Sequence, residues 1–125
     1  MSQTVEFAYS RADKAAAHYR YVPFDVPEGT TRIDIAISYN KVKDVCWLDI
    51  SLLDPTATDF PSETGLVGWS GGSRDELFTA TDDATPGYLW GPIVPGKWNL
   101  LIGLSRIPDE GAKGHLTITL DSADR

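Results

Sequence analysis

The sequence has few of the residues that build disulfides and metal centres. Its 125 residues include one cysteine, Cys46, and two histidines, His18 and His115. A single cysteine excludes an internal disulfide framework, and its position in an apolar run predicts a buried structural thiol. Hydrolytic metal sites need several His, Asp, Glu or Cys side chains around one ion, and no HxH, HExxH or CxxC spacing occurs here. We therefore expect two surface histidines, no metal site and no cofactor.

Long apolar runs are missing as well. No stretch approaches the roughly 18 residues that a membrane-spanning helix needs. The first 14 residues, MSQTVEFAYSRADK, lack the basic-then-apolar order of a signal peptide. The sequence therefore predicts a cytoplasmic protein that does not enter a membrane.

Positive charge is the third scarce feature. Eleven Lys and Arg residues stand against 18 Asp and Glu, which gives a formal net charge of −7. Nucleic acids and anionic membrane surfaces both attract a concentrated positive surface, and the basic residues here are scattered. Neither nucleic acid nor membrane is expected as a partner.

Alternation of apolar and polar residues is the dominant pattern that is present. It is typical of antiparallel strands with one dry and one wet face, and helical periodicity is confined to residues 11–17. The spacing predicts an all-β fold, a two-sheet antiparallel β-sandwich of jelly-roll or Ig-like type with about eight or nine strands. A single domain is expected over 1–125, with an N-terminal extension or edge strand at 1–17, a core at 18–120 and a tail at 121–125. The expected strands are 4–9, 18–25, 32–39, 48–52, 65–70, 75–80, 87–90, 98–104 and 116–120.

The residues give little support to two further interpretations, a calcium site and a serine nucleophile. Acidic pairs at 82–83 and 109–110, and the Asp54/Asp59 loop, could bind calcium, but solvated turns explain them equally well. The serine of Gly-Trp-Ser70-Gly-Gly is not in a G-x-S-x-G elbow, and nothing in the sequence orients a histidine toward it. The chain is therefore predicted not to be an enzyme.

The aromatic residues carry the strongest functional signal. Trp98 is in phase with the core, whereas Trp47 is out of phase and should face outward or pack under a terminal strand. The candidate binding residues lie in Gly- and Pro-rich stretches, where exposed rings beside an arginine could contact sugar rings or a partner protein. These residues are Trp69, Arg74, Tyr88 and Trp90. The alternative interpretation is that the rings close the ends of the sandwich over the glycines.

Several ordered motifs, at 21–33, 48–55, 68–74, 84–88 and 91–98, carry a family resemblance. Together they resemble the N-terminal β-sandwich that precedes the catalytic domain in CehA/McbA-type metallohydrolases of the PHP superfamily. The resemblance covers roughly residues 18–120. It departs from the family pattern at Val67, Trp90 and Ser105, and the metal-binding PHP domain is not among the 125 residues.

The resemblance implies a non-catalytic accessory or interaction module. Its expected partner is a PHP-type catalytic domain, in cis or in trans, or a second copy in a homo-oligomer. The alternative is a carbohydrate-binding module that stacks sugars on Trp69, Tyr88 and Trp90. A hydrolase is the third and weakest hypothesis.

Overall fold

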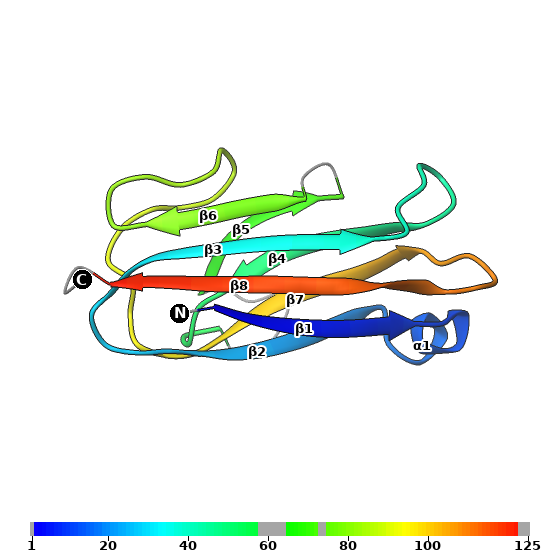
Figure 1. Cartoon of the computed structure of the whole chain (residues 1–125), viewed down its shortest axis with the longest axis horizontal. Helices are drawn as coiled ribbons and strands as arrows, with labels where there is room; N and C mark the ends of the chain where they lie inside the picture. The colour runs from blue at the N-terminus through cyan, green and yellow to red at the C-terminus, as the bar shows by residue number, and fades with distance from the viewer. Residues whose placement is uncertain (1, 58–64, 73–74, 123–125) are drawn as a thin grey trace.

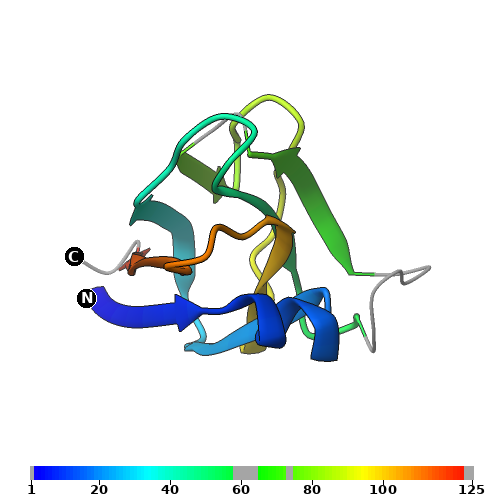
Figure 2. The same cartoon turned by 90° about the vertical axis from the view of Figure 1, so that its right-hand side faces the viewer.

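The computed structural model describes residues 2–57, 65–72 and 75–122, which form eight strands and one short helix (Figure 1). The strands and the helix run in the order β1 Ser2–Tyr9, α1 Arg11–Ala16, β2 Tyr19–Val26, β3 Thr30–Tyr39, β4 Trp47–Leu53, β5 Leu66–Gly71, β6 Glu76–Ala80, β7 Gly96–Arg106 and β8 Ala112–Ser122. They build two antiparallel four-stranded sheets that face each other, as the view along the strands shows (Figure 2). The predicted all-β sandwich is confirmed.

The strand order shows which kind of sandwich this is. One sheet has the order β1-β8-β3-β6 and the other β2-β7-β4-β5. The first strand therefore pairs with the last, the second with the seventh, the third with the sixth and the fourth with the fifth. Such nested pairing is that of a long antiparallel hairpin rolled into two layers, which is the jelly-roll arrangement.

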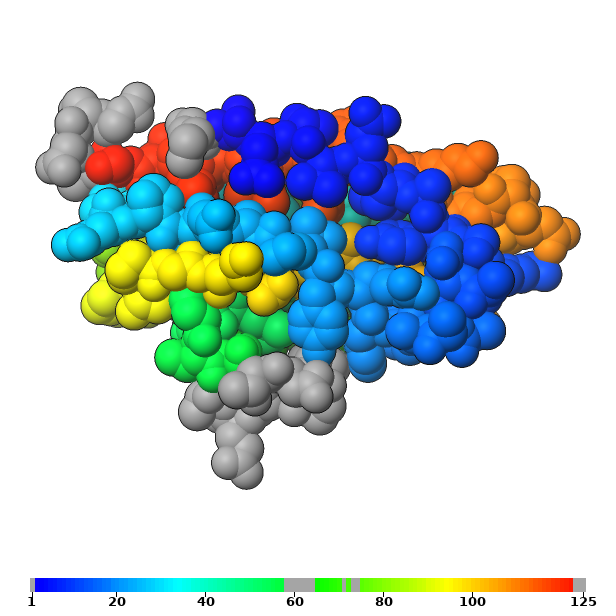
Figure 3. Space-filling view, turned by 90° about the horizontal axis from the view of Figure 1, so that it is seen from below, coloured from blue at the N-terminus to red at the C-terminus, as the bar shows by residue number. Residues whose placement is uncertain are grey.

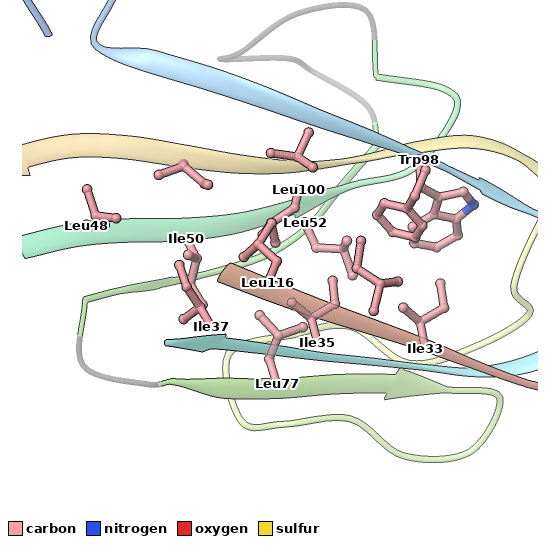
Figure 4. Close-up of a cluster of buried hydrophobic side chains, with 14 of the residues drawn as sticks. Ile33, Ile35, Ile37, Leu48, Ile50, Leu52, Leu77, Trp98, Leu100 and Leu116 are labelled. Atoms are coloured by element: carbon pink, nitrogen blue, oxygen red, sulfur yellow. The ribbon is translucent and has the colours of Figure 1, made fainter. Parts of the chain in front are cut away.

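The inner faces of both sheets supply the core, as the alternation predicted. Ile33, Ile35 and Ile37 of β3 lie against Leu100 and its in-phase neighbours on β7, all of them buried (Figure 4). Trp98 is 3% exposed, so its predicted burial is confirmed, and its Nε1 donates to the carbonyl of Val94 at 2.9 Å. Burial of this apolar surface is the main force that holds the two sheets together.

The helix α1 begins at Arg11 because Ser10 caps its N-terminus, and it spans most of the helix-compatible segment 11–17. The Ser10 hydroxyl accepts a hydrogen bond from the Asp13 backbone N–H, and the Asp13 carboxylate accepts one from the Ser10 N–H. Hydrogen bonds that the Asp13 carboxylate accepts from the Ser10 backbone N–H and from the Ser10 hydroxyl lower its pKa. Among the described residues α1 is the one helix, and its six residues are far too few to cross a bilayer.

Residues 87–90 do not form the strand that their alternation suggested. Thr85, Pro86, Gly87 and Tyr88 make a turn instead, in which the Tyr88 N–H donates to the Thr85 carbonyl at 2.9 Å. Proline and then glycine at the two central positions, with Gly87 at φ 96°, are what a type II turn requires. One isolated bridge, between Gly68 and Tyr88, is the only strand-like pairing found for this segment among the described residues.

The N-terminal segment completes one sheet. β1 pairs with β8 along its length, from Ser2 opposite Thr119 to Tyr9 opposite Ala112, and forms an edge of the sheet. At the other terminus β8 continues through Asp121 to Ser122. Both terminal segments therefore take part in strand pairing.

Candidate interaction site

The structure brings two of the predicted aromatic segments side by side. Trp69 lies in β5, and Tyr88 and Trp90 lie in the connection from β6 to β7. The Leu89 N–H donates to the Val67 carbonyl at 2.8 Å, so this connection runs along the outer edge of β5. Arg74, the fourth predicted residue, lies outside the described residues.

Tyr88 points into the molecule. Its side chain is 6% exposed, and its hydroxyl donates to Ser70 Oγ at 2.9 Å. The ring packs on the backbone of Gly68, where an added Cβ would lie 2.5 Å from the Tyr88 Cγ and 2.7 Å from the Gly87 carbonyl oxygen. A ring held this way is part of the interior and has no free face for a sugar.

Trp47 repeats this arrangement at Gly72. An added Cβ at Gly72 would lie 2.6 Å from Cδ1 of Trp47 and closer still to its Nε1. The outer side of the half-buried Trp47 ring carries the Lys41 ammonium, 4.6 Å from the ring centroid. For Tyr88 and Trp47, the interpretation that aromatic rings close over glycines describes the packing.

Trp69 and Trp90 are exposed, by 39% and 64% respectively. Gly68 and Tyr88 form an isolated antiparallel bridge. In this register Trp69 lies opposite Gly87, and Trp90 lies opposite Leu66. Three residues along a strand separate the two levels, or about 10 Å at roughly 3.3 Å per residue. Tyr88, which would have to bridge them, is turned inward, so the two tryptophans offer separate surfaces.

A more prominent apolar surface surrounds Trp90. Leu89 is 68% exposed, Trp90 64% and Val94 41%, and these side chains project from residues 89–94, which we call the 89–94 loop. Sequence reasoning found Trp90 but missed Leu89 and Val94. The available signal was two large apolar residues in succession directly before Gly91-Pro92, where alternation fails.

Hydrogen bonds hold the backbone of the 89–94 loop in place. Besides its N–H bond to Val67, Leu89 accepts a bond from the Thr79 hydroxyl at 2.7 Å. The Gly91 N–H donates to the Ala80 carbonyl at 3.0 Å, and Val94 accepts from the indole of Trp98. The loop is thus tied to β5, β6 and β7, while its Leu89, Trp90 and Val94 side chains stay exposed.

A hollow of about 240 Å³ lies beside the loop. Its lining combines polar and apolar atoms and includes Asp54, Leu66, Trp90, Ile93, Val94 and Trp98. The Asp54 carboxylate accepts hydrogen bonds from the backbone N–H and the hydroxyl of Thr56, at 2.8 and 2.6 Å. The hollow is too small for most drug-sized ligands but large enough for one side chain of a partner.

The acidic pairs do not converge on a common point. Residues 2–57, 65–72 and 75–122 contain no group of three His, Cys, Asp or Glu side chains placed to hold a metal ion, and Asp59 lies outside these ranges. Asp83 makes local hydrogen bonds instead. Its carboxylate accepts one from the Ala84 N–H at 2.8 Å, and its backbone carbonyl accepts one from the Ala80 N–H. On the outer face nearby, two hydrogen bonds from Arg32 to Asp34 raise the pKa of the guanidinium.

The opposite end of the sandwich carries a larger hollow of about 840 Å³, which more charged residues line and which lies between α1 and the loop after β7 (Figure 1). Two of its cations have structural partners. Arg11 donates to the Ile107 carbonyl and forms an ion pair of 2.6 Å with Asp109, while Lys14 donates to the Ser105 carbonyl at 2.8 Å. These contacts hold α1 against the end of β7.

The two histidines are exposed, as expected of surface residues; His18 directly precedes β2, and His115 lies in β8. His115 on β8 lies between Glu6 on β1 and Ser38 on β3, all in register on one outer face. The sequence did not indicate this row, which only strand pairing creates. Among the described residues no hydrogen bond joins the three side chains, so the row lacks the contacts that activate a serine.

Two further groups have perturbed acidity. Burial raises the pKa of the Cys46 thiol, and the Glu110 carboxylate acts in the same direction. Cys46 is 1% exposed, so the predicted buried thiol is confirmed. Burial also raises the pKa of Asp49 on β4, an effect that nearby His18 opposes.

No model of a known protein family matches the chain, and no curated protein matches it either. We therefore infer function from the geometry of the 89–94 loop and from the motifs of the sequence.

Proposed function

We propose that the chain is a non-catalytic interaction module that binds a partner protein through the 89–94 loop. The observation that carries this proposal is the exposure of Leu89 and Trp90, at 68% and 64%, on a backbone that hydrogen bonds hold in place. Tryptophan is among the residues that contribute most binding energy at protein interfaces.

The fixed backbone of the 89–94 loop favours binding because the loop would lose little further conformational freedom when a partner binds. Association normally costs free energy for each loop and side chain that must be immobilised. The 89–94 loop is already tied at Leu89, Gly91 and Val94, so mainly the side chains of Leu89 and Trp90 would lose freedom. The adjacent 240 Å³ hollow would accept an apolar side chain of the partner.

The partner that we propose is a PHP-type metallohydrolase domain, in cis or in trans, following the resemblance of residues 18–120. The position of the loop is compatible with a domain attached after β8. Arg32 lies in register with Ala80 on one side and Asp121 on the other, and Ala80 is bonded to Gly91. The loop and the end of β8 thus lie at the same end of the sandwich (Figure 1).

Calorimetric titration tests this proposal. The chain is titrated into the catalytic domain of a CehA/McbA-type metallohydrolase from which the native N-terminal sandwich has been removed. We expect binding, and we expect Leu89→Ser and Trp90→Ala each to weaken it by about 1–3 kcal/mol. Trp69→Ala is the matched control, because it removes an exposed tryptophan outside the loop and should leave the affinity unchanged.

Two outcomes would contradict the proposal. Absence of binding to the catalytic domain would remove the proposed partner. Binding of oligosaccharides to the chain, lost equally in the Trp69→Ala and Trp90→Ala variants, would favour the carbohydrate-binding alternative instead.

A further inference from the structure

The four sheet edges of the sandwich differ in whether another strand can add to them. Two four-stranded sheets have four edge strands, which here are β1, β6, β2 and β5. An edge strand exposes a row of backbone N–H and C=O groups that can pair with another chain, and proteins usually block such rows. The state of each edge can be read from the hydrogen bonds.

Both edges beside the 89–94 loop are occupied by the chain itself. Along β6, the Ala80 N–H donates to Asp83, the Phe78 N–H to the Thr85 hydroxyl, and the Thr85 N–H to the Phe78 carbonyl. Along β5, residues 88–89 bridge to Gly68 and bond to Val67. No strand can add at these places without displacing the chain.

The third edge, β2, is interrupted by proline. Pro23 stands in the middle of Tyr19–Val26, opposite Asn99 of β7. Proline has no N–H to donate and is tolerated in a strand where that position faces away from the neighbour. The outer edge of β2 is therefore broken at its centre.

The fourth edge, β1, has neither form of protection. Ser2–Tyr9 contains no proline, no glycine and one charged residue, Glu6. Its pairing with β8 uses one side of the strand, and among the described residues no hydrogen bond reaches its other side. In the view from below, β1 (dark blue) runs along the side of the molecule next to β2 (Figure 3).

We propose that β1 pairs with β1 of a second copy, antiparallel about a twofold axis at Val5, and joins the two β1 sheets into one. Directly opposite residues share a face in such a pair. On the inner face the partly buried Val5 would meet its own counterpart, and the partly buried Phe7 would lie against the exposed Gln3. On the outer face Glu6 would meet Thr4.

Charge and ladder length select this register. A twofold axis at Glu6 would place two Glu6 carboxylates directly opposite each other, which is destabilising. An axis at Phe7 would avoid that repulsion but would pair only residues 5–9, a shorter ladder than 2–8. The Val5 register pairs the longer stretch with no like charges opposed, and a second copy supplies the same apolar-inside, polar-outside alternation that β1 has.

Sedimentation of the full chain over a range of concentrations tests this pairing. We expect a monomer–dimer equilibrium that responds in opposite directions to two variants at one exposed site. The twofold axis creates two pairs of residue 4 with Glu6. Thr4→Glu would place a glutamate opposite Glu6 in both pairs, and Thr4→Lys would place a lysine there. The dissociation constant should rise about two- to thirtyfold in the first and fall by a similar factor in the second.

Ser38 provides the matched control, because it is exposed on β3, two strands away from β1. Ser38→Glu and Ser38→Lys change the net charge in the same way and should leave the dissociation constant unchanged. A chain that stays monomeric up to about 500 µM would overturn the proposal. So would a dimer in which Thr4→Glu and Thr4→Lys act alike. Trp90→Ala should not affect this equilibrium, which separates the result from the proposed role of the 89–94 loop.

Discussion

Tyr88 and Trp90 are two residues apart, both aromatic, and both set among glycines and prolines, yet they occupy opposite environments. Tyr88 is 6% exposed and Trp90 is 64% exposed. The difference lies in what stands across from each ring. Tyr88 faces Gly68, whose missing side chain leaves space for the ring against β5. Trp90 lies level with Leu66 instead, and after it the chain bonds to Ala80 through the Gly91 N–H and continues to β7.

An aromatic residue near a glycine can therefore be buried or exposed, depending on whether the glycine lies opposite its ring. Trp47 follows Tyr88 in this respect, because Gly72 lies under its indole. Substitutions at these positions should therefore divide into those that change stability and those that leave it unchanged.

The largest effect is expected for Tyr88→Ala. Removing a buried aromatic ring from between β5 and the core leaves a cavity, and such changes cost about 3–5 kcal/mol in the free energy of unfolding. Urea denaturation followed by far-UV circular dichroism measures the loss. A loss below about 1 kcal/mol would mean that the ring is not a structural element.

Gly68→Ala should destabilise the chain less, by about 1–3 kcal/mol, because the new methyl group must displace the Tyr88 ring. The double variant Gly68→Ala/Tyr88→Ala checks the cause. With the ring gone, only the contact of the methyl group with the Gly87 carbonyl oxygen remains, so the combined loss should be smaller than the sum of the two single losses. Additive losses would show that Gly68 is needed for another reason.

Tyr88→Phe should have a smaller effect, about 0.5–1.5 kcal/mol. It keeps the ring on Gly68 and removes only the hydroxyl that donates to Ser70 Oγ at 2.9 Å. Thermal unfolding of both proteins in one buffer measures the difference. If Tyr88→Phe and Tyr88→Ala were equally unstable, the hydroxyl and not the ring packing would stabilise this end of the sandwich.

The smallest effect is expected for Trp90→Ala, which should change the free energy of unfolding by less than about 0.5 kcal/mol. The ring is mostly exposed, and the hydrogen bonds of the 89–94 loop are made by other residues. Trp98→Ala, at a buried tryptophan, is the contrasting control and should cost about 3–5 kcal/mol. A large loss in the free energy of unfolding of Trp90→Ala would mean that the exposed Trp90 ring stabilises the fold as the buried rings do.

Much of the fold follows from alternation alone. The isoleucines of β3 and the leucines of β4 and β7 face the core as their period of two predicts, and the strand positions agree to within a few residues. The segment 87–90 is the exception to this agreement. It alternates like a strand, but the turn chemistry of Pro86-Gly87 takes precedence over the alternation.

The candidate site was predictable only in part. Composition drew attention to Trp69, Tyr88 and Trp90 but could not distinguish them, because the orientation of Tyr88 depends on Gly68, which lies far away in the sequence. Leu89 was missed although it directly precedes Trp90 and interrupts the alternation, and Val94 was missed because an exposed apolar residue looks the same in sequence as a buried one. The row of Glu6, His115 and Ser38 also depends entirely on which strands are neighbours.

By itself the sequence determined that the chain forms an all-β sandwich, which residues face the core, and where the capped helix begins. These features depend on local periodicity and on short-range hydrogen bonds, and both can be read from neighbouring residues. Tertiary structure alone decided the nested strand order, the inward turn of Tyr88 and the edge at β1, to whose outer side no described residue forms a hydrogen bond. Each of these is a relation between segments distant in sequence, and periodicity carries no information about which segments meet.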